Sequence, residues 1–214
     1  MASDHYFSAA PESELKLREI SITIAGHAYA LTTANGIFSP DHIDTGTQVL
    51  LDNVPEPPPS GDFLDLGCGW GPISLHLALA APHATVWAVD VNERALDLVR
   101  RNAARLGLGN VNAVLAKDVP DDVRFRGIWS NPPIRVGKEE LHSLMRTWLP
   151  RLSAGSDAWL VVQRNLGADS LQRWLESVLD DGFGVSRAAT KKGFRVLRVR
   201  RHEPKAPGAG LSRD

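Results

Sequence analysis

Cysteine is almost absent from this 214-residue chain, which contains only Cys68. An internal disulfide is therefore excluded, and the seven histidines are scattered without the spacing of paired metal ligands. No apolar run approaches the roughly 20 residues needed to cross a bilayer, and the first residues, MASDHYFSAAPESE, lack a basic-then-apolar signal pattern. We expect a cytoplasmic protein that binds neither membrane nor metal. The formal net charge of -1 argues against a protein that coats nucleic acid, but leaves room for a local basic surface.

The apolar pattern divides the chain into a prelude, a connector and a main fold. Two strand-like runs, Arg18 to Ile24 and His27 to Thr33, flank an Ala25-Gly26 turn and predict a hairpin. The proline-rich run 55–61 cannot donate a continuous hydrogen-bond ladder and indicates a connector. The tail EPKAPGAGLSRD is rich in Pro and Gly, so it is expected to be disordered. Within one domain, the predicted divisions are 1–54 for the hairpin and the segment after it, 55–61 for the connector, 62–202 for the core and 203–214 for the tail.

Beyond the connector, strand-like runs alternate with amphipathic stretches. The strand-like runs are FLDL, TVWAVD, VNAVLA, GIWS and AWLVVQ, and the helical stretches are Ile73 to Ala81, Glu93 to Leu106, Lys138 to Leu149 and about Ser170 to Leu179. This alternation predicts an α/β fold with a parallel sheet and crossover helices. The last two runs, Gly184 to Ala189 and Arg195 to Arg200, are joined by only a few residues, which predicts an antiparallel hairpin at the sheet edge.

The first chemical motif is Asp65-Leu66-Gly67-Cys68-Gly69-Trp70-Gly71, placed between a strand and a helix. Glycines at that junction let the backbone approach a ligand in the crevice beyond the strand's carboxyl end, although they also suit a simple capping turn. The next strand ends in Asp90, whose carboxylate can accept both hydroxyls of a ribose, or can cap the helix that follows. Together the two signals favour a bound nucleoside.

A nicotinamide cofactor fits this motif poorly. The third glycine of a dinucleotide fingerprint would fall on Pro72. Asp65, two residues before the first glycine, would repel a pyrophosphate but can hydrogen-bond an ammonium group. Hydride transfer is therefore disfavoured.

The second motif is Asn131-Pro132-Pro133-Ile134, at the end of the run Ile128 to Ser130. Two prolines stiffen the backbone, remove two donors and leave carbonyl groups available. The side-chain oxygen of Asn131 and the carbonyl of Pro132 can accept the two hydrogens of an amino or amide group. With an activated methyl donor, orientation and desolvation can then supply most of the catalysis. A rigid turn that merely ends a strand is the other interpretation of this motif.

Taken together, these motifs resemble the small-domain methyltransferase family, which includes the 16S ribosomal RNA guanine-N2 methyltransferases. The resemblance runs from His5 to Arg201, and it is carried by DLGCGWGPI, NPPI, HYF from His5, GIFSPDHIDTGTQVLL from Gly36, NLGADSLQRWL from Asn165 and KKGFRVLRV from Lys191. It implies a Rossmann-like, class I fold that binds S-adenosylmethionine on a seven-strand, mostly parallel sheet with its last strand antiparallel. It also implies that the segment after the hairpin covers the cofactor.

The resemblance assigns roles residue by residue. It implies catalysis by Asn131, Pro132, Pro133 and Ile134, and cofactor binding by Phe38, Asp44, Gly46, Thr47, Asp65, Gly67, Cys68, Gly69, Gly71, Asp90, Val91, Asp118, Val119 and Asn131. In this assignment Asp90 binds the ribose, Asp118 lies by the adenine and Asn131 holds the target amine. The family's aromatic residue after Pro-Pro is Ile134 here, so stacking on a target base must come from another residue such as Phe38.

RNA binding is expected along Arg187 to Arg201, which contains seven basic residues and no acidic one. Arg135, Lys191, Lys192 and Arg195 are the candidate RNA contacts, although strand arginines can simply keep a sheet edge soluble. Better-known relatives also carry a duplicated amino-terminal domain, for which the prelude before Pro55 is too short.

The hypothesis is a monomeric methyltransferase acting on guanine N2 of small-subunit ribosomal RNA, free or in the 30S subunit. The alternatives are a glutamine-amide methyltransferase acting on a translation factor and a non-catalytic module that binds the cofactor. Cys68 has no basic partner nearby in sequence, so a thiol nucleophile is not expected. A hydrolase built on Ser39, His42 and Asp44 lacks a Gly-x-Ser-x-Gly elbow.

Overall fold

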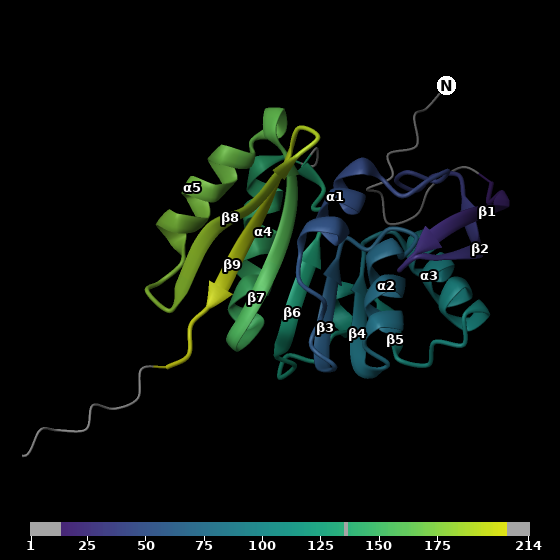
Figure 1. Ribbon diagram of the computed structural model, residues 1–214, viewed down its shortest axis with the longest axis horizontal. Helices are drawn as coiled ribbons and strands as arrows, with labels where there is room; N and C mark the ends of the chain where they lie inside the picture. Colours follow the sequence, from purple (N-terminus) through teal and green to yellow (C-terminus); the bar gives the residue numbers. More distant parts are fainter. Residues whose placement is uncertain (1–13, 135–136, 205–214) are drawn as a thin grey trace, which may run out of the picture.

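The computed structural model describes residues 14–134 and 137–204, and a seven-stranded sheet runs through them (Figure 1). The strand order is β5-β4-β3-β6-β7-β9-β8, with bounds β3 Ser60–Leu66, β4 His83–Val89, β5 Val111–Val114, β6 Phe125–Ser130, β7 Leu152–Gln163, β8 Phe183–Lys191 and β9 Phe194–Arg201. The first five strands in this order are parallel, whereas β9 is antiparallel to both β7 and β8. The predicted α/β fold with an antiparallel last strand is confirmed.

Helices cover both faces of the sheet, as crossover connections require. They are α1 Thr45–Asn53, α2 Pro72–Ala80, α3 Glu93–Arg105, α4 Lys138–Trp148 and α5 Ala168–Val178, with short 3-10 turns at Ala116–Asp118, Leu149–Arg151 and Arg164–Leu166. Neighbouring residues of β3 show how the sheet divides the core. Phe63 packs with the buried residues of α1 and α2, and Leu64 packs with those of α4 and α5.

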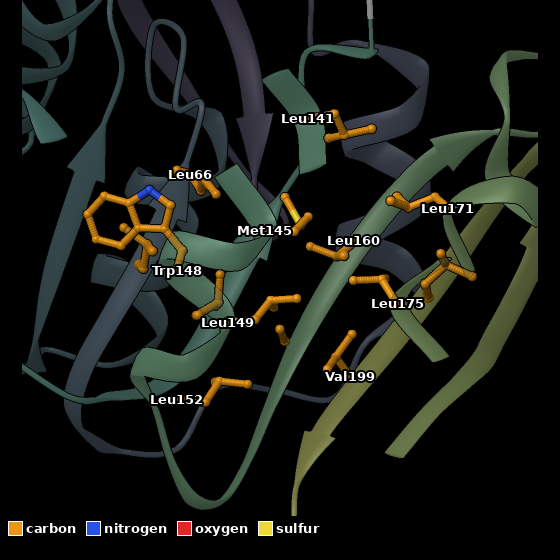
Figure 2. Packing of buried hydrophobic residues seen from close by; sticks show 14 of the residues in the cluster. Leu66, Leu141, Met145, Trp148, Leu149, Leu152, Leu160, Leu171, Leu175 and Val199 are labelled. Carbon is orange, nitrogen blue, oxygen red and sulfur yellow. The ribbon is translucent and has the colours of Figure 1, made fainter. Parts of the chain in front are cut away.

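The α4 and α5 face carries the largest apolar cluster (Figure 2). Its members include Met145 and Trp148 of α4, Leu171 of α5, Leu160 of β7 and Val199 of β9, with Met145 beside Leu160 in the middle of the cluster. Burying each such side chain contributes about 1.5–3 kcal/mol relative to leaving it in water. Because parallel strands are apolar on both faces, they occur in the sequence as continuous runs such as FLDL rather than as alternating patterns.

The predicted hairpin is formed by β1 Leu17–Ile24 and β2 His27–Ala34. Ala25 and Gly26 both have positive φ, as a two-residue turn of the type I′ class requires. The side chain of Asn102 in α3 fixes the hairpin to the main fold. Its Oδ1 accepts from the backbone N of Thr32 at 2.7 Å, and its Nδ2 donates to the Thr32 carbonyl at 2.9 Å.

One helix and two boundaries differ from the sequence prediction. Helix α1 was not predicted; Asp44 caps it by accepting from the backbone N of Gly46. Strand β3 starts at Ser60, inside the predicted connector 55–61. Strand β7 starts at Leu152, ahead of the predicted run AWLVVQ; Leu152 pairs with Phe125 of β6, and after a shift in register the pairing resumes at Asp157 opposite Gly127.

The predicted tail lies outside the described residues beyond Pro204, as does the HYF segment at 5–7. Among the described helices, none is long and apolar enough to span a membrane. Nor do the described residues contain a group of three or more side chains suited to hold a metal ion.

Candidate active site

A cavity of about 310 Å³ opens at the carboxyl ends of β3, β4, β6 and β7, within the size range of small-molecule sites. Four segments of the chain form most of its wall. They are Ile37 to Thr47 before α1 and in its first turn, Leu66 to Ile73 around the glycine turn, Val89 to Ala95 after β4, and Asn131 to Ile134 after β6. The two sequence motifs therefore meet in one cavity.

The glycine turn holds its backbone open toward this cavity. The backbone N atoms of Gly67 and Cys68 both donate to the Val89 carbonyl, at 2.8 and 3.1 Å, which attaches the turn to the end of β4. Gly69 has φ +55, and a Cβ added there would meet no protein atom within 4 Å. Gly71 serves a different purpose, since its added Cβ would lie 3.1 Å from the Val99 side chain. Gly69 therefore leaves space at the cavity, while Gly71 allows α2 and α3 to pack closely.

Asp90 organises the turn that follows β4. Its Oδ2 accepts from the backbone N of Gly69 and its Oδ1 from that of Asn92, both at 2.9 Å. Burial raises the pKa of Asp90, and the hydrogen bonds from these backbone groups act in the opposite direction. Each carboxylate oxygen can accept a further hydrogen bond, so this geometry is compatible with two ribose hydroxyls.

Asp65 is fully buried behind the glycine turn and does not line the cavity. Its Oδ2 accepts from the backbone N of Ser74 at 2.9 Å and from the Ser74 hydroxyl at 2.5 Å. Its Oδ1 has no hydrogen-bond partner within the described part of the chain. Burial raises the pKa of Asp65 to about 7, and the charge of Asp90 adds to that effect. Because this oxygen lies behind the turn and not on the cavity wall, its predicted contact with a cationic ligand group, such as the ammonium of a methionine moiety, stays a prediction.

The segment before α1 is fixed to the two turns beneath it. The indole Nε1 of Trp70 donates to the Ser39 carbonyl, and Nδ2 of Asn92 donates to the Gly36 carbonyl, both at 3.0 Å. Phe38 lies between these anchors in the sequence, lines the cavity and remains 43% exposed. The segment therefore lies over the side of the cavity where Asp90 is located.

The amide of Asn131 is oriented by α1. Its Nδ2 donates to Oδ2 of Asp44 at 2.8 Å and to Oγ1 of Thr47 at 3.1 Å. A carboxylate can only accept hydrogen bonds, so the nitrogen of the amide must face Asp44 and the oxygen must face away from it. Opposite this motif, a Cβ at Gly67 would lie 3.7 Å from Cδ of Pro133. The glycine turn and the Asn-Pro-Pro motif are thus in close proximity across the cavity.

The sequence-predicted residues divide into two groups. Those that line the cavity are Phe38, Asp44, Thr47, Gly67, Cys68, Gly69, Asp90, Val91, Asn131, Pro132, Pro133 and Ile134. Those that do not are Gly46, Asp65, Gly71, Asp118 and Val119. Asp118 is exposed and Val119 is buried in the core, whereas Ala116 of the same turn reaches the cavity wall. A contact with the cofactor stays a prediction for the residues of both groups.

The thiol of Cys68 is not an activated nucleophile. Burial and the nearby charges of Asp90 and Asp65 raise its pKa well above the usual value. This agrees with the expectation that the Cys68 thiol does not act as a nucleophile, while a contact of its backbone with a cofactor stays a prediction.

One part of the cavity wall was not predicted. Leu144 and Trp148 of α4, Gln163 and Leu166 at and after the end of β7, and Phe194 of β9 also line the cavity. Leu166 and Phe194 lie in the segments NLGADSLQRWL and KKGFRVLRV, which carry the family resemblance but were assigned no role at the cavity. Only the folded sheet brings these residues to one edge.

The arginines predicted to bind RNA are largely engaged within the protein. Arg195 and Arg187 both pair with Asp169 of α5. Arg198 and Arg200 both pair with Asp157 of β7, at 2.7 and 2.9 Å. The segment 187–201 contains no acidic residue, but its partners come from elsewhere in the fold, so it is less basic as a surface than its sequence indicates. Lys191 and Lys192 are exposed at the β8–β9 turn, and Arg135 lies outside the described residues.

Comparisons with known proteins agree with this geometry. A family model described as methyltransferase small domain matches residues 28–198. The Bacillus subtilis protein called uncharacterized protein YbxB is 34% identical over 202 residues, which is 93% of this chain and 99% of that protein. Ribosomal RNA small subunit methyltransferase C of Klebsiella pneumoniae is 33% identical over 176 residues, which is 79% of this chain and 48% of that protein. The chain thus spans about half the length of the methyltransferase C relatives.

Among solved structures, the T. thermophilus 16S rRNA N2 G1207 methyltransferase in complex with AdoMet and guanosine superposes with a TM-score of 0.76. The two sequences are 23% identical, and the match covers 90% of this chain and 52% of that chain. At this identity the superposition shows a common fold.

Proposed function

The chain belongs to the methyltransferase small domain family, and on that premise we propose that it transfers a methyl group from S-adenosylmethionine to guanine N2 of small-subunit ribosomal RNA. The observation that carries the proposal is the fixed amide of Asn131. Its nitrogen is bound by Asp44 and Thr47, so its oxygen is the atom available to accept a hydrogen from a target amine.

The residues around the cavity fit the proposed cofactor in three ways. The Asp90 carboxylate has acceptor capacity for the ribose hydroxyls, and the space beside Gly69 admits a ligand close to the backbone. Behind the glycine turn, and not on the cavity wall itself, the unpartnered oxygen of buried Asp65 is the acceptor that we propose for the ammonium group. When bound, S-adenosylmethionine supplies a sulfonium-activated methyl group, so the protein does not need a strong base to start the reaction.

In this proposal the protein's own contribution is orientation. Oδ1 of Asn131 accepts one amine hydrogen and the carbonyl of Pro132 accepts the other. That carbonyl already accepts from the backbone N of Ile134 at 2.8 Å, which fixes its direction and leaves its second lone pair for the target. The nitrogen lone pair then points toward the glycine-turn side, and the proton released after transfer leaves to solvent. Holding the reactants in line in this way accounts for much of the barrier reduction.

The choice of RNA rests on the relatives and on a small basic area. Several relatives are named ribosomal RNA small subunit methyltransferase C. Lys191 and Lys192 are exposed next to Phe194, which lines the cavity, so they are suited to phosphates that flank a target base. We propose that the protein acts as a cytoplasmic monomer on this RNA, alone or within the 30S subunit.

The same acceptors also fit the carboxamide of glutamine. The internal pairing of the strand arginines favours this second candidate, because it reduces the positive surface available to RNA. The substrate would then be a protein of the translation apparatus.

The test is transfer of labelled methyl from S-adenosylmethionine to small ribosomal subunits, naked ribosomal RNA and a protein extract, each from cells that lack this protein. Label at guanine N2, lost with Asn131→Ala, supports the proposal. Label confined to protein supports the glutamine alternative instead. Cofactor binding without label in any of the three substrates would contradict both and favour a binding module.

A further inference from the structure

The target side of the cavity needs a flat surface if the substrate is a nucleobase, and this inference rests on the function proposed above. A base taken out of a stack loses a few kcal/mol of stacking, which proteins commonly restore with an aromatic side chain. The residue after Pro133 is the aliphatic Ile134, which has no ring. Outside the glycine turn, the aromatic residues that line the cavity and are candidates for stacking on the base are Phe38, Trp148 and Phe194.

Two of these three are poorly placed for the task. Phe38 belongs to the segment that Trp70 and Asn92 anchor, so it lies on the side of Asp90 rather than that of Asn131. Trp148 is only 2% exposed, and the guanidinium of Arg151 lies 4.9 Å from its ring centroid. Its ring is therefore already packed within the core of the α4 face (Figure 2).

Phe194 is placed directly beside the residues that hold Asn131. It is the first residue of β9, half-buried, and its Cε1 would lie only 2.9 Å from a Cβ added at Gly46. The same added Cβ would lie 2.9 Å from Oδ2 of Asp44, the atom that accepts from Asn131. The absence of a side chain at Gly46 thus makes room for the ring next to the Asp44 carboxylate, which gives this glycine a role without any cofactor contact.

The position of the ring is fixed by the strands on both sides. Phe194 pairs in register with Gln163, the last residue of β7, and Gln163 also lines the cavity. The carbonyl of Gly193, just before the ring, accepts from the backbone N of Arg164 at 2.8 Å. A rigidly held ring costs little entropy when a planar ligand stacks on it.

We propose that Phe194 stacks on the target base and so supplies the flat surface that Ile134 lacks. Phe194 then determines specificity: it favours a planar, amine-bearing base over a flexible glutamine side chain, because only the base presents a ring face. Lys191 and Lys192 precede it in the same turn, so base and phosphate recognition come from one short segment.

The test compares Phe194→Leu, which keeps apolar bulk but removes the plane, with Phe194→Tyr, which keeps the plane. The matched control is Phe183→Leu in the same hairpin. Phe183 pairs with Arg201 at the opposite end of β9, and its ring lies 5.7 Å from the Arg201 guanidinium. For each variant we would measure kcat and KM for ribosomal RNA, affinity for S-adenosylmethionine by calorimetry, and thermal stability.

We expect Phe194→Leu to lower kcat/KM for RNA by about 5- to 150-fold, the range for losing one base–aromatic stack, with cofactor affinity unchanged. Phe194→Tyr should stay near the wild type, as should Phe183→Leu. The stacking role would be overturned if Phe194→Leu were as active as the wild type, or if Phe194→Leu and Phe194→Tyr lost equal activity. Either result would leave the proposed function standing. Absence of RNA methylation by the wild type would instead overturn the proposed function, and base stacking with it.

Discussion

Replacing Asp65 by asparagine should change how the stability of the protein depends on pH. The carboxyl group is fully buried, and burial raises its pKa from an ordinary 3.8 to about 7. Between these two values the unfolded chain has released the proton while the folded chain keeps it. Unfolding therefore releases a proton in this range, and the free energy of unfolding falls as the pH rises.

The size of this effect follows from the two pKa values. Each pKa unit corresponds to about 1.4 kcal/mol, so the interval from 3.8 to about 7 is worth about 4 kcal/mol. This stability is fully present below pH 3.8 and is lost as the pH rises through about 7. It is a large part of the roughly 5–15 kcal/mol typical of a small domain. The asparagine amide has no proton to lose in this range, so Asp65→Asn should remove this contribution to the pH dependence.

The assay is urea unfolding of the wild type and Asp65→Asn from about pH 4 to about pH 8, without cofactor. Other ionisable groups contribute to both proteins, so the difference between the two curves isolates Asp65. The free energy of unfolding of the variant, relative to that of the wild type, should increase as the pH rises, by up to about 4 kcal/mol. Ser74→Ala is the companion variant. It removes a hydroxyl that lowers the pKa of Asp65, so it should move the loss of stability to higher pH. A difference curve that is flat over this range would refute the reasoning.

Three further results are expected. Asn131→Ala should lower turnover by about 100- to 1,000-fold, as expected for the loss of one preorganised hydrogen-bonding group, while calorimetry shows retained cofactor binding. Unchanged turnover would exclude a role of Asn131 in holding the amine. Asp90→Ala should weaken cofactor affinity by about 10- to 150-fold, since hydrogen bonds to a charged group are lost, and an unaltered dissociation constant would exclude the ribose contact. Lys192→Ala should reduce the salt dependence of RNA binding by about one unit of slope, whereas Arg195→Ala should leave it unchanged, because Asp169 already pairs with that arginine. Equal effects of these two substitutions would show that the pairing does not persist on RNA.

The order of strands and helices could be predicted from the sequence because both faces of a parallel sheet are covered. Runs such as FLDL and GIWS are apolar almost throughout, and the helices between them carry apolar faces, so each element has its own local signal. Helix α1 has a weaker local signal in the sequence. Its nine residues follow Asp44 and begin with Thr45-Gly46-Thr47, a sequence that also suits a turn. The capping by Asp44 is apparent only from its hydrogen bond with the backbone N of Gly46.

The part of the cavity wall formed by the two motifs was predictable for a similar reason, because Gly67, Gly69, Asp90 and Asn131 each follow closely on a strand. The part formed by Gln163 and Phe194 was not. Gln163 and Phe194 are register partners on antiparallel strands, and their meeting depends on the long-range pairing of β7 with β9. The internal pairing of the strand arginines could not be predicted for the same reason. Asp157 lies 41 and 43 residues before its two arginine partners. The segment 187–201 therefore contains the positive charges but not the carboxylate that pairs with them.

A single oxygen atom, Oδ2 of Asp44, begins α1 by accepting from Gly46 and also sets the direction of the Asn131 amide. A substitution that removes this oxygen therefore takes away the cap of α1 and the acceptor of the Asn131 amide together. Gln163 and Phe194 border the cavity without capping a helix, so a change there alters the cavity wall while both hydrogen bonds of Asp44 stay in place. The start of one helix and the geometry of the Asn-Pro-Pro motif are thus coupled through one atom.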